Sequence, residues 1–285
     1  ATLQGLTGQA LMSSDRLTDL SAERVDMMRK VYPATDIRPL DLFPSEARKR
    51  IWDLKVNHLG RQYDVTGLFN LDGAKPVTLN LNWKELGIET DAPVHVFDYW
   101  NSEYMGAWET GTALEIMPAS VRVLTLVPDN GKIQLVSTSR HITQGWVDLR
   151  ELRSDEQGTV ISGVSTLPAG NEYKLHFACP RGKYFRVKTA TAVAGKKKLD
   201  VQASSHQGWA EVSFTAPVSG DISWSVSFEP DYAYSYTVRQ PDGISVEPEG
   251  LNAARVTWRS QYYLNSGYQV YLDGKLMGYT PNSFY

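Results

Sequence analysis

The feature that most constrains this sequence is a period-two alternation of apolar and polar residues in short runs, which begins at Arg61. The runs are rich in β-branched and aromatic residues, and Gly, Pro, Asn and Asp separate them. Typical runs are QYDVTGLFN, VTLNLNW, PVHVFDYWN, TVISGVSTL and ISWSVSFEP. This spacing favours short antiparallel strands, so we expect a mainly β protein made of antiparallel β-sandwich domains.

The first part of the chain lacks this alternation and has helix signals instead. Ser21 can act as an N-cap and Pro33 can end a helix, so we expect a helix over residues 22–31. The stretch SEARKRIWDL, residues 45–54, has apolar residues on one helical side and predicts a second helix. We therefore expect α/β structure before the sandwiches.

Breaks in the pattern predict four domains or part-domains. An antiparallel β-domain follows the helical start and ends near the turn sequence PDNG, and a second series of short strands then forms a sandwich. The tail, with the runs VTWRS and YQVYLDG, looks like a truncated fibronectin type III module. The predicted boundaries are 1–57, 58–130, 131–230 and 231–285.

Composition excludes several classes of function. The net charge is −3 and the longest basic run is Lys196–Lys198, so we expect no nucleic-acid partner. No run approaches the roughly 18 apolar residues of a spanning helix, and we expect no membrane insertion. Cys179 is the single cysteine and reads as a small buried hydrophobe. The five histidines are scattered along the chain, so neither a metal site nor a cofactor is expected.

Two ordered motifs carry a resemblance to a known family. The first is Ser13-Ser14-Asp15-Arg16 followed by Ser21-Ala22-Glu23-Arg24. The second is the text GLFN…LNWKELGI…HVFDYWNSEYMGAW…IMPAS…LTLVP, whose matching residues are Phe69, Asn70, Leu86, Gly87, Asp98, Trp100, Gly106, Pro118 and Leu124. In this order they resemble the C-terminal portion of the melibiase-type α-galactosidases, which are clan D glycoside hydrolases.

The resemblance implies a fold and an activity. Residues 8–14 would be the last strand of a (β/α)8 barrel and residues 22–31 the helix after it, so the start would be a short α/β remnant of that barrel. In this family the two catalytic aspartates of the retaining mechanism lie on earlier strands, so we expect no catalytic residue in this chain. Asp15 and Arg16 would bind substrate, an α-galactoside or related glycan, in the periplasm or outside the cell. The alternative is that Asp15 only caps the loop or pairs with Arg16.

A second stretch, Ser137 to Trp146, gathers a serine, a histidine and a tryptophan. Without a third group at a recognisable spacing we expect no hydrolytic triad. We expect His141 to be a turn or strand histidine with one hydrogen bond, and Arg140 to form a surface pair with Asp148. Elsewhere Trp108, Trp146 or Trp209 could stack on a sugar ring if exposed.

Two functions from different classes remain open. The first is the C-terminal segment of an α-galactosidase-like retaining glycoside hydrolase, which would support the catalytic barrel in carbohydrate degradation. The second is a non-catalytic carbohydrate-binding or structural β-sandwich protein. For the residues after Lys132, a purely structural role is our preferred reading.

Overall fold

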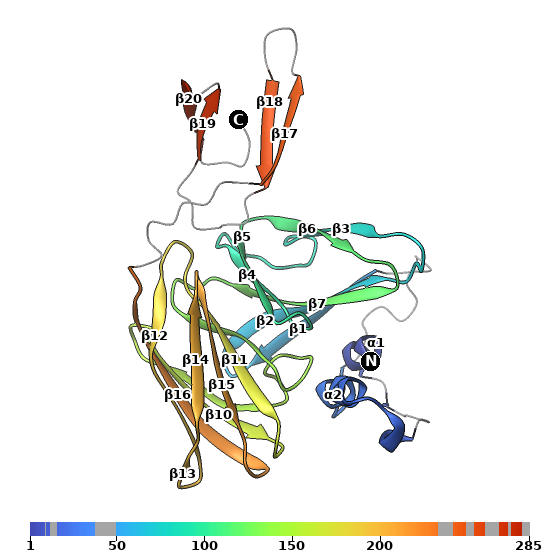
Figure 1. Cartoon of the computed structure of the whole chain (residues 1–285), viewed down its shortest axis with the longest axis vertical. Coiled ribbons are helices and arrows are strands. Elements are labelled where there is room, and N and C mark those ends of the chain that lie inside the picture. Colours follow the sequence, from blue (N-terminus) through green and yellow to red (C-terminus); the bar gives the residue numbers. More distant parts are fainter. Residues whose placement is uncertain are drawn as a thin grey trace.

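The structure is a computed structural model that describes residues 1–8, 10–11, 16–37, 50–232, 242–248, 254–259, 268–272 and 275–280. It is mainly β and its sheets are antiparallel, which confirms the predicted fold class (Figure 1). None of the helices in these ranges is long and apolar enough to span a bilayer.

The first sheet has five strands in the order β1-β2-β7-β4-β5. Its members are β1 (Ile51–His58), β2 (Arg61–Asn70), β7 (Ser120–Pro128), β4 (Val94–Asp98) and β5 (Glu103–Trp108). A separate pair, β3 (Val77–Asn82) and β6 (Gly111–Ile116), packs against one face of this sheet through a core that includes Leu68, Leu81 and Leu124. Residues 63–70 of β2 are all buried, because both faces of the sheet are covered.

The second β region is a sandwich of two sheets. The five-stranded sheet has the order β13-β12-β16-β10-β9 and the four-stranded sheet the order β14-β15-β11-β8. Its strands are β8 (Gln134–Thr138), β9 (Leu149–Ser154), β10 (Val160–Leu167), β11 (Glu172–Ala178), β12 (Phe185–Ala194), β13 (Lys197–Lys198), β14 (Val201–His206), β15 (Trp209–Thr215) and β16 (Gly220–Pro230). Residues such as Leu175, Phe177 and Trp224 fill the space between the sheets.

The N-terminal segment contains α1 (Thr2–Thr7), a 3-10 turn (Leu17–Asp19) and α2 (Ala22–Val31). The predicted helix at 22–31 is confirmed, and its N-cap Ser21 accepts a hydrogen bond from the Arg24 N–H at 3.4 Å. Helix α1 was not predicted. It ends at Gly8, whose φ of 64° and close approach to the Thr35 and Ile37 carbonyl oxygens leave no room for a side chain.

The expected barrel remnant is not supported. Within the described residues 1–8, 10–11 and 16–37 there is no strand, Gly8 closes a helix, and residues 9 and 12–15 lie outside the described part. The helix expected over 45–54 is wrong for its second half, since Ile51 to Leu54 belong to β1. In β1 every second residue, Trp52, Leu54 and Val56, faces the core that the helices cover, which is the period of two of a strand.

Helices α1 and α2 cover the face of the first sheet opposite to β3 and β6 (Figure 1). Leu6 of α1 and Val31 of α2 are buried there with Val65 and Val123 of the sheet. Gly5 lets the two helices approach, because a Cβ at this position would lie 3.0 Å from Val31. The N-terminal segment is therefore part of the core of the first β region.

Several residues that carry the family resemblance stabilise turns. The Asn70 side-chain amide donates to the Lys75 and Ile116 carbonyl oxygens at 2.8 and 3.0 Å. Asp98 is fully buried and accepts from the Asn101 amide at 2.9 Å and the Arg122 guanidinium at 2.6 Å. These structural contacts account for the residue types without a catalytic or ligand-binding role.

The described parts of the tail form two pairs of antiparallel strands. Strand β17 (Asp242–Pro248) pairs with β18 (Ala254–Arg259), and β19 (Tyr268–Leu272) pairs with β20 (Lys275–Thr280). The sequence pair Asp273-Gly274 between the last two strands favours a tight hairpin turn, but it lies outside the described residues. The fibronectin-like module stays a prediction.

Candidate functional site

The loop between β8 and β9, residues 139–148, joins the three packed parts of the molecule. Its Ile142 N–H donates to the Lys30 carbonyl at the end of α2, at 2.7 Å. Its Thr143 carbonyl accepts from the Tyr63 hydroxyl of β2 at 2.7 Å. The buried Gln144 side chain accepts from Ser137 of β8 at 2.7 Å and also from Thr125 of β7. None of these ten residues is exposed and six are buried, and the loop's hydrogen bonds hold the helices, the first sheet and the sandwich together.

His141 in this loop has a structural role. It is fully buried, its Nε2 lies 3.0 Å from the Pro33 carbonyl oxygen, and its Nδ1 lies 2.8 Å from the Thr143 hydroxyl. Burial lowers the pKa of His141, so the ring is neutral at pH 7. The serine of this stretch, Ser137, bonds Gln144 instead, and no triad forms here.

The predicted surface pair between Arg140 and Asp148 is wrong. Asp148 is 1% exposed and accepts from the Tyr173 hydroxyl at 2.6 Å. Arg140 donates to the carbonyl oxygens of Arg29 and Tyr32 at 2.7 and 3.2 Å. Arg140 thus binds the carbonyl groups at the C-terminal end of α2, where a cation is favourable.

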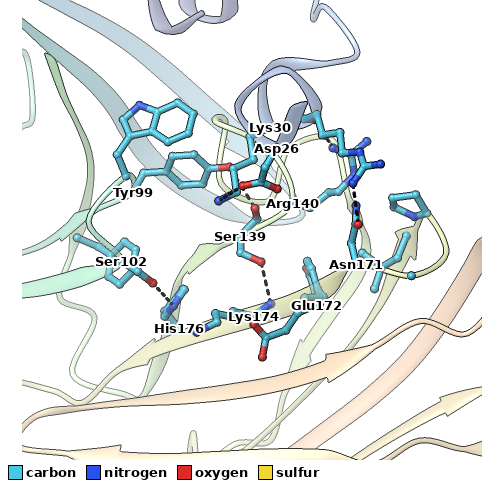
Figure 2. Close-up of a pocket in the computed structure, with 17 residues that line it drawn as sticks. Asp26, Lys30, Tyr99, Ser102, Ser139, Arg140, Asn171, Glu172, Lys174 and His176 are labelled. Atoms are coloured by element: carbon cyan, nitrogen blue, oxygen red, sulfur yellow. Dashed lines mark hydrogen bonds and ion pairs between the residues drawn. The ribbon is translucent and has the colours of Figure 1, made fainter. Parts of the chain in front are cut away.

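A cavity of about 360 Å3 opens where α2, the β4–β5 turn and the sandwich meet, and we call it the junction pocket (Figure 2). This size is within the range of small-molecule sites, roughly 300–1,000 Å3. Four segments of the sequence supply its walls: α2, the end of β4 with the turn after it, the residues after β8, and the region from the end of β10 through β11. The polar lining residues are Asp26, Arg29, Lys30, Ser102, Ser139, Arg140, Asn171, Glu172, Lys174 and His176.

One wall of the junction pocket is aromatic. Tyr99 and Trp100 pack edge to face with their centroids 5.0 Å apart, and the Tyr99 hydroxyl donates to the Ser139 carbonyl at 3.1 Å. The Trp100 indole N–H donates to the Thr2 hydroxyl at 3.1 Å. The Lys30 ammonium lies 5.9 Å from the Trp100 ring centroid and 6.0 Å from that of Tyr99. Both rings are therefore held in place, with a cation beside them.

Another wall contains a serine and a histidine from different parts of the chain, and a glutamate outside the pocket lining contacts that histidine. Ser102 Oγ lies 3.3 Å from His176 Nε2 (Figure 2). Glu211 Oε2 lies 3.1 Å from the same nitrogen. A triad needs the serine on one ring nitrogen and the acid on the other. Because both groups share Nε2, this arrangement does not activate Ser102 as a nucleophile.

The charges in this wall compensate one another. The hydrogen bond from His176, aided by Lys174, lowers the pKa of Glu211 to about 2 despite partial burial. Burial lowers the pKa of His176, so it donates to Glu211 as a neutral ring at pH 7. Lys174 contacts Glu211 at 2.8 Å, and this outweighs burial and raises the pKa of the lysine. These contacts fix the side chains of Lys174 and His176, which line the pocket.

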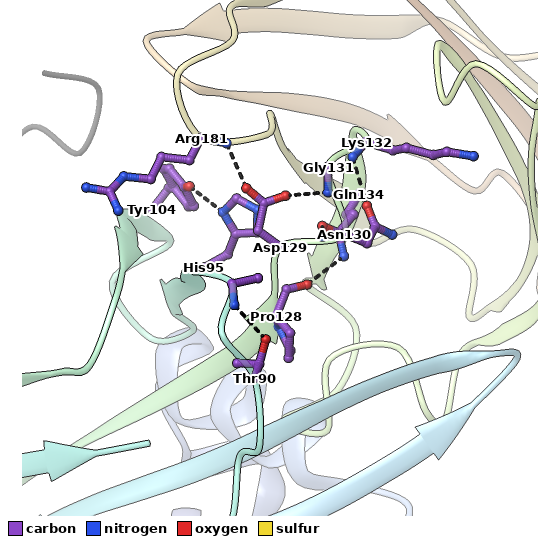
Figure 3. A network of polar contacts seen from close by, with 11 residues as sticks. Thr90, His95, Tyr104, Pro128, Asp129, Asn130, Gly131, Lys132, Gln134 and Arg181 are labelled. Atoms are coloured by element: carbon purple, nitrogen blue, oxygen red, sulfur yellow. Dashed lines mark hydrogen bonds and ion pairs between the residues drawn. The ribbon is translucent and has the colours of Figure 1, made fainter. Parts of the chain in front are cut away.

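A second polar network, lining no part of that pocket, also joins the first β region to the sandwich (Figure 3). His95 Nδ1 lies 2.7 Å from the Tyr104 hydroxyl, and Nε2 lies 3.7 Å from Asp129. Asp129 accepts from the Arg181 and Gly131 N–H groups, both at 2.8 Å. Burial opposes ionisation of Asp129, but His95 and these N–H groups outweigh it and lower its pKa. Together with the 139–148 loop, this network fixes the first β region against the sandwich.

The residues singled out from the sequence fall mostly elsewhere. Asp15 lies outside the described residues, and Arg16 is exposed and does not line the junction pocket. Cys179 is buried as predicted, and burial raises its pKa to about 12. Trp108, Trp146 and Trp209 are half-buried and also do not line it. Trp100 does line the junction pocket. The sequence feature that could have indicated it is the run DYW, in which two aromatic residues directly follow a turn aspartate.

Metal binding finds no support in the described part of the chain. No three His, Cys, Asp or Glu side chains there come close enough together to hold a metal ion. The carboxylates and histidines at the two junctions are instead engaged with Arg, Lys, Tyr and backbone groups.

No protein-family model matches the chain, and a comparison with curated proteins finds no match. Among solved structures it is similar to an isomalto-dextranase of Arthrobacter globiformis T6 complexed with panose, at 13% identity and a TM-score of 0.22. The match covers 57% of this chain and 34% of the other, so the chain spans about a third of that protein. A TM-score this low supports no conclusion about fold or activity.

Proposed function

We propose that this chain is a non-catalytic, β-rich part of a carbohydrate-active protein and that it binds a sugar in the junction pocket. The observation that carries the proposal is a cavity of about 360 Å3 with Tyr99 and Trp100 on one side and hydrogen-bonding groups on the others. A pyranose has one apolar CH face and a rim of hydroxyl groups. It needs an aromatic surface next to mixed donors and acceptors.

The lining side chains meet both requirements. Lys30 and Arg140 donate, Asp26 and Glu172 accept, and the hydroxyl of Ser102 does either. These groups come from four segments, and one of them, the 139–148 loop, bonds to the other three. The site is thus preformed, which reduces the entropy lost when a ligand binds.

The finer proposal follows the sequence resemblance. The parent protein would be an α-galactosidase-like retaining glycoside hydrolase of the periplasm or the extracellular space, and the ligand an α-galactoside. Both carboxyl groups of the double-displacement mechanism would be supplied by a barrel outside this chain. The β regions would support that barrel and hold a part of the substrate.

The test is a binding titration of the full chain with α-galacto-oligosaccharides by isothermal calorimetry. We expect Trp100→Ala to weaken binding about tenfold, since it removes the stacking surface. The matched control is Thr2→Val, which removes only the hydroxyl that accepts from the indole, and should bind normally. Binding that is unchanged in Trp100→Ala would refute the junction pocket as the sugar site.

A second assay addresses catalysis. The chain alone should not hydrolyse an aryl α-galactoside, because the reacting carboxyl pair would lie elsewhere. Robust turnover that persists after affinity purification and in variants of the pocket residues would show a reaction centre in this chain. That result would refute the non-catalytic role.

A purely structural role is the second candidate, and one observation favours it. The 139–148 loop holds the end of α2 by three hydrogen bonds, from Ile142 and Arg140 to carbonyl groups. These hydrogen bonds hold the N-terminal helix against the rest of the molecule, independently of any ligand in the pocket. The same titration separates the two roles, since a brace predicts no saturable glycan binding.

A further inference from the structure

We infer that the junction pocket selects acidic sugars, and that it pairs a ring carboxylate with the arginine side chains at the end of α2. This inference rests on the proposed sugar site and names its ligand class. The chemical distinction is between a neutral hexose and the uronic acid that carries a carboxylate at the same carbon.

The first observation is the charge of the lining. Four cationic side chains, Arg29, Lys30, Arg140 and Lys174, line the cavity against two acidic ones, Asp26 and Glu172. The whole chain has a formal net charge of −3, so this excess is local. A partly enclosed site with excess positive charge concentrates anions.

The second observation is which cations already have a charged partner. Lys30 pairs with Asp26 at 2.9 Å, one helical turn apart, and Lys174 pairs with Glu211 at 2.8 Å. The guanidinium of Arg29 donates to the neutral Asn171 amide oxygen at 3.2 Å, and that of Arg140 to backbone carbonyl oxygens. Among the described residues, no carboxylate lies within 4.0 Å of either guanidinium.

The third observation is how these arginines are held. The Arg140 group is anchored at the C-terminal end of α2 by two carbonyl oxygens, and the exposed Arg29 side chain donates a hydrogen bond to Asn171. A planar guanidinium that is already fixed loses little side-chain entropy when it binds, and its fork matches a carboxylate. Lys30 lies close to the aromatic wall, with its ammonium 5.9 Å from the Trp100 ring centroid.

These positions suit a ring stacked on Trp100 with its carboxylate directed to the arginines. A charge-assisted hydrogen bond is about twice as strong as a neutral one. Galacturonate and galactose differ only at the sixth carbon and so form a matched pair. We expect the acid to bind on the order of tenfold more tightly than the neutral sugar at low salt.

The experiment is a titration of the isotope-labelled full chain with galacturonate, galactose and sodium acetate, monitored by the Trp100 indole N–H signal, which Trp100→Phe assigns. We expect saturable shifts with both sugars, tighter binding of galacturonate, and a preference that shrinks at high salt. Acetate should not shift this signal, because it has no ring to stack.

Two variants test the assignment. Arg29→Gln should remove most of the preference for galacturonate while galactose still binds. Arg153→Gln makes the same change at an exposed residue, 77% exposed and outside the pocket, and should leave the preference intact. A Tm within a few degrees of the parent chain verifies that each variant is folded.

The outcomes separate this inference from the proposed sugar site. Equal affinity for the two sugars, or a preference that Arg29→Gln leaves unchanged, would overturn the acidic selectivity alone. Acetate binding as well as galacturonate would show a simple anion site and overturn it too. No shift with either sugar would overturn both proposals.

Discussion

The two main β regions bury their strands in different ways. In the sandwich the five-stranded sheet has one covered face, and its strand β10 alternates regularly between buried and partly exposed residues. The first sheet is covered on both faces, by β3 and β6 on one and by the helices and the sandwich on the other. As a result β2 is a continuous buried run.

This difference also separates the sources of stability. The sandwich core is built only from residues of the sandwich itself, between Ile133 and Phe228. One core of the first region instead uses Leu6, Val31, Ile142 and Ala178 from other parts of the chain. The first region therefore depends on its neighbours, and the sandwich core does not.

The largest expected effect tests the self-contained sandwich. Phe177 is fully buried and packs edge to face on Trp224 and Phe228. Phe177→Ala should lower the free energy of unfolding by about 3–5 kcal/mol, because no neighbouring part fills the cavity. Denaturant unfolding monitored by circular dichroism measures it. Val218→Ala, at a 62% exposed residue, is the control and should change little.

The next effect tests the dependence of the first region on helix α1. Leu6 is 5% exposed in the shared core, whereas Leu3 on the same helix is 45% exposed. Leu6→Ala should cost about 2–3 kcal/mol, near the lower end for buried leucines because a short helix can shift. Leu3→Ala should stay within about 0.5 kcal/mol. Equal costs for both variants would show that the helix is not needed by this core.

The same difference explains what could be predicted from the sequence. In the sandwich and in most of the first sheet, alternation and turn residues predicted strands correctly, because each strand has a polar side or ends in a clear turn. The helix at 22–31 was predicted from local signals at Ser21 and Pro33, and Ser21 does act as its N-cap. Sequence rules thus predict secondary structure correctly where contacts between residues close in the sequence determine it.

Prediction failed where distant contacts decide. The helical spacing of apolar residues over 45–54 suggested a helix, but pairing of β1 with β2 across eight residue pairs overrides that preference. Helix α1 was missed because its burial depends on Val31 and Ile142, far along the chain. The junction pocket could not be predicted, since its walls come from residues 26–30, 99–102, 139–140 and 167–176.

The third prediction concerns a carboxylate of the sandwich. The hydrogen bond from His176 lowers the pKa of Glu211 to about 2, below its unfolded value. The folded state therefore binds fewer protons than the unfolded state, and this stabilisation is present above the unfolded pKa and lost as the pH falls toward 2. Glu211→Gln should lower the free energy of unfolding at pH 7 by about 1–2 kcal/mol and by less at pH 3.

The measurement is chemical denaturation at several pH values between 7 and 3, with the parent chain and the variant compared at each. Arg153→Gln serves as a control for a lost surface ion pair, which should have almost no effect. A Glu211→Gln cost that stays constant across this range would contradict the lowered pKa.

The smallest effect has the opposite sign and lies in the first region. Burial, together with the neighbouring Asp53 carboxylate, raises the pKa of Asp64 to about 6, although the Lys55 ammonium opposes this. The folded state thus binds the extra proton more tightly, so this group's contribution to stability falls as the pH rises from about 4 to about 6. Asp64→Asn removes the titration and should raise the stability at pH 7, relative to pH 4, on the order of 1 kcal/mol. Thr66 donates to Asp53 at 2.7 Å, so Thr66→Val tests whether a disturbed Asp53 alone gives the same result. Relative to the parent chain, the stability of Asp64→Asn should increase with pH and that of Glu211→Gln should decrease with pH. If both changes have the same sign, the contrast between the two regions does not hold.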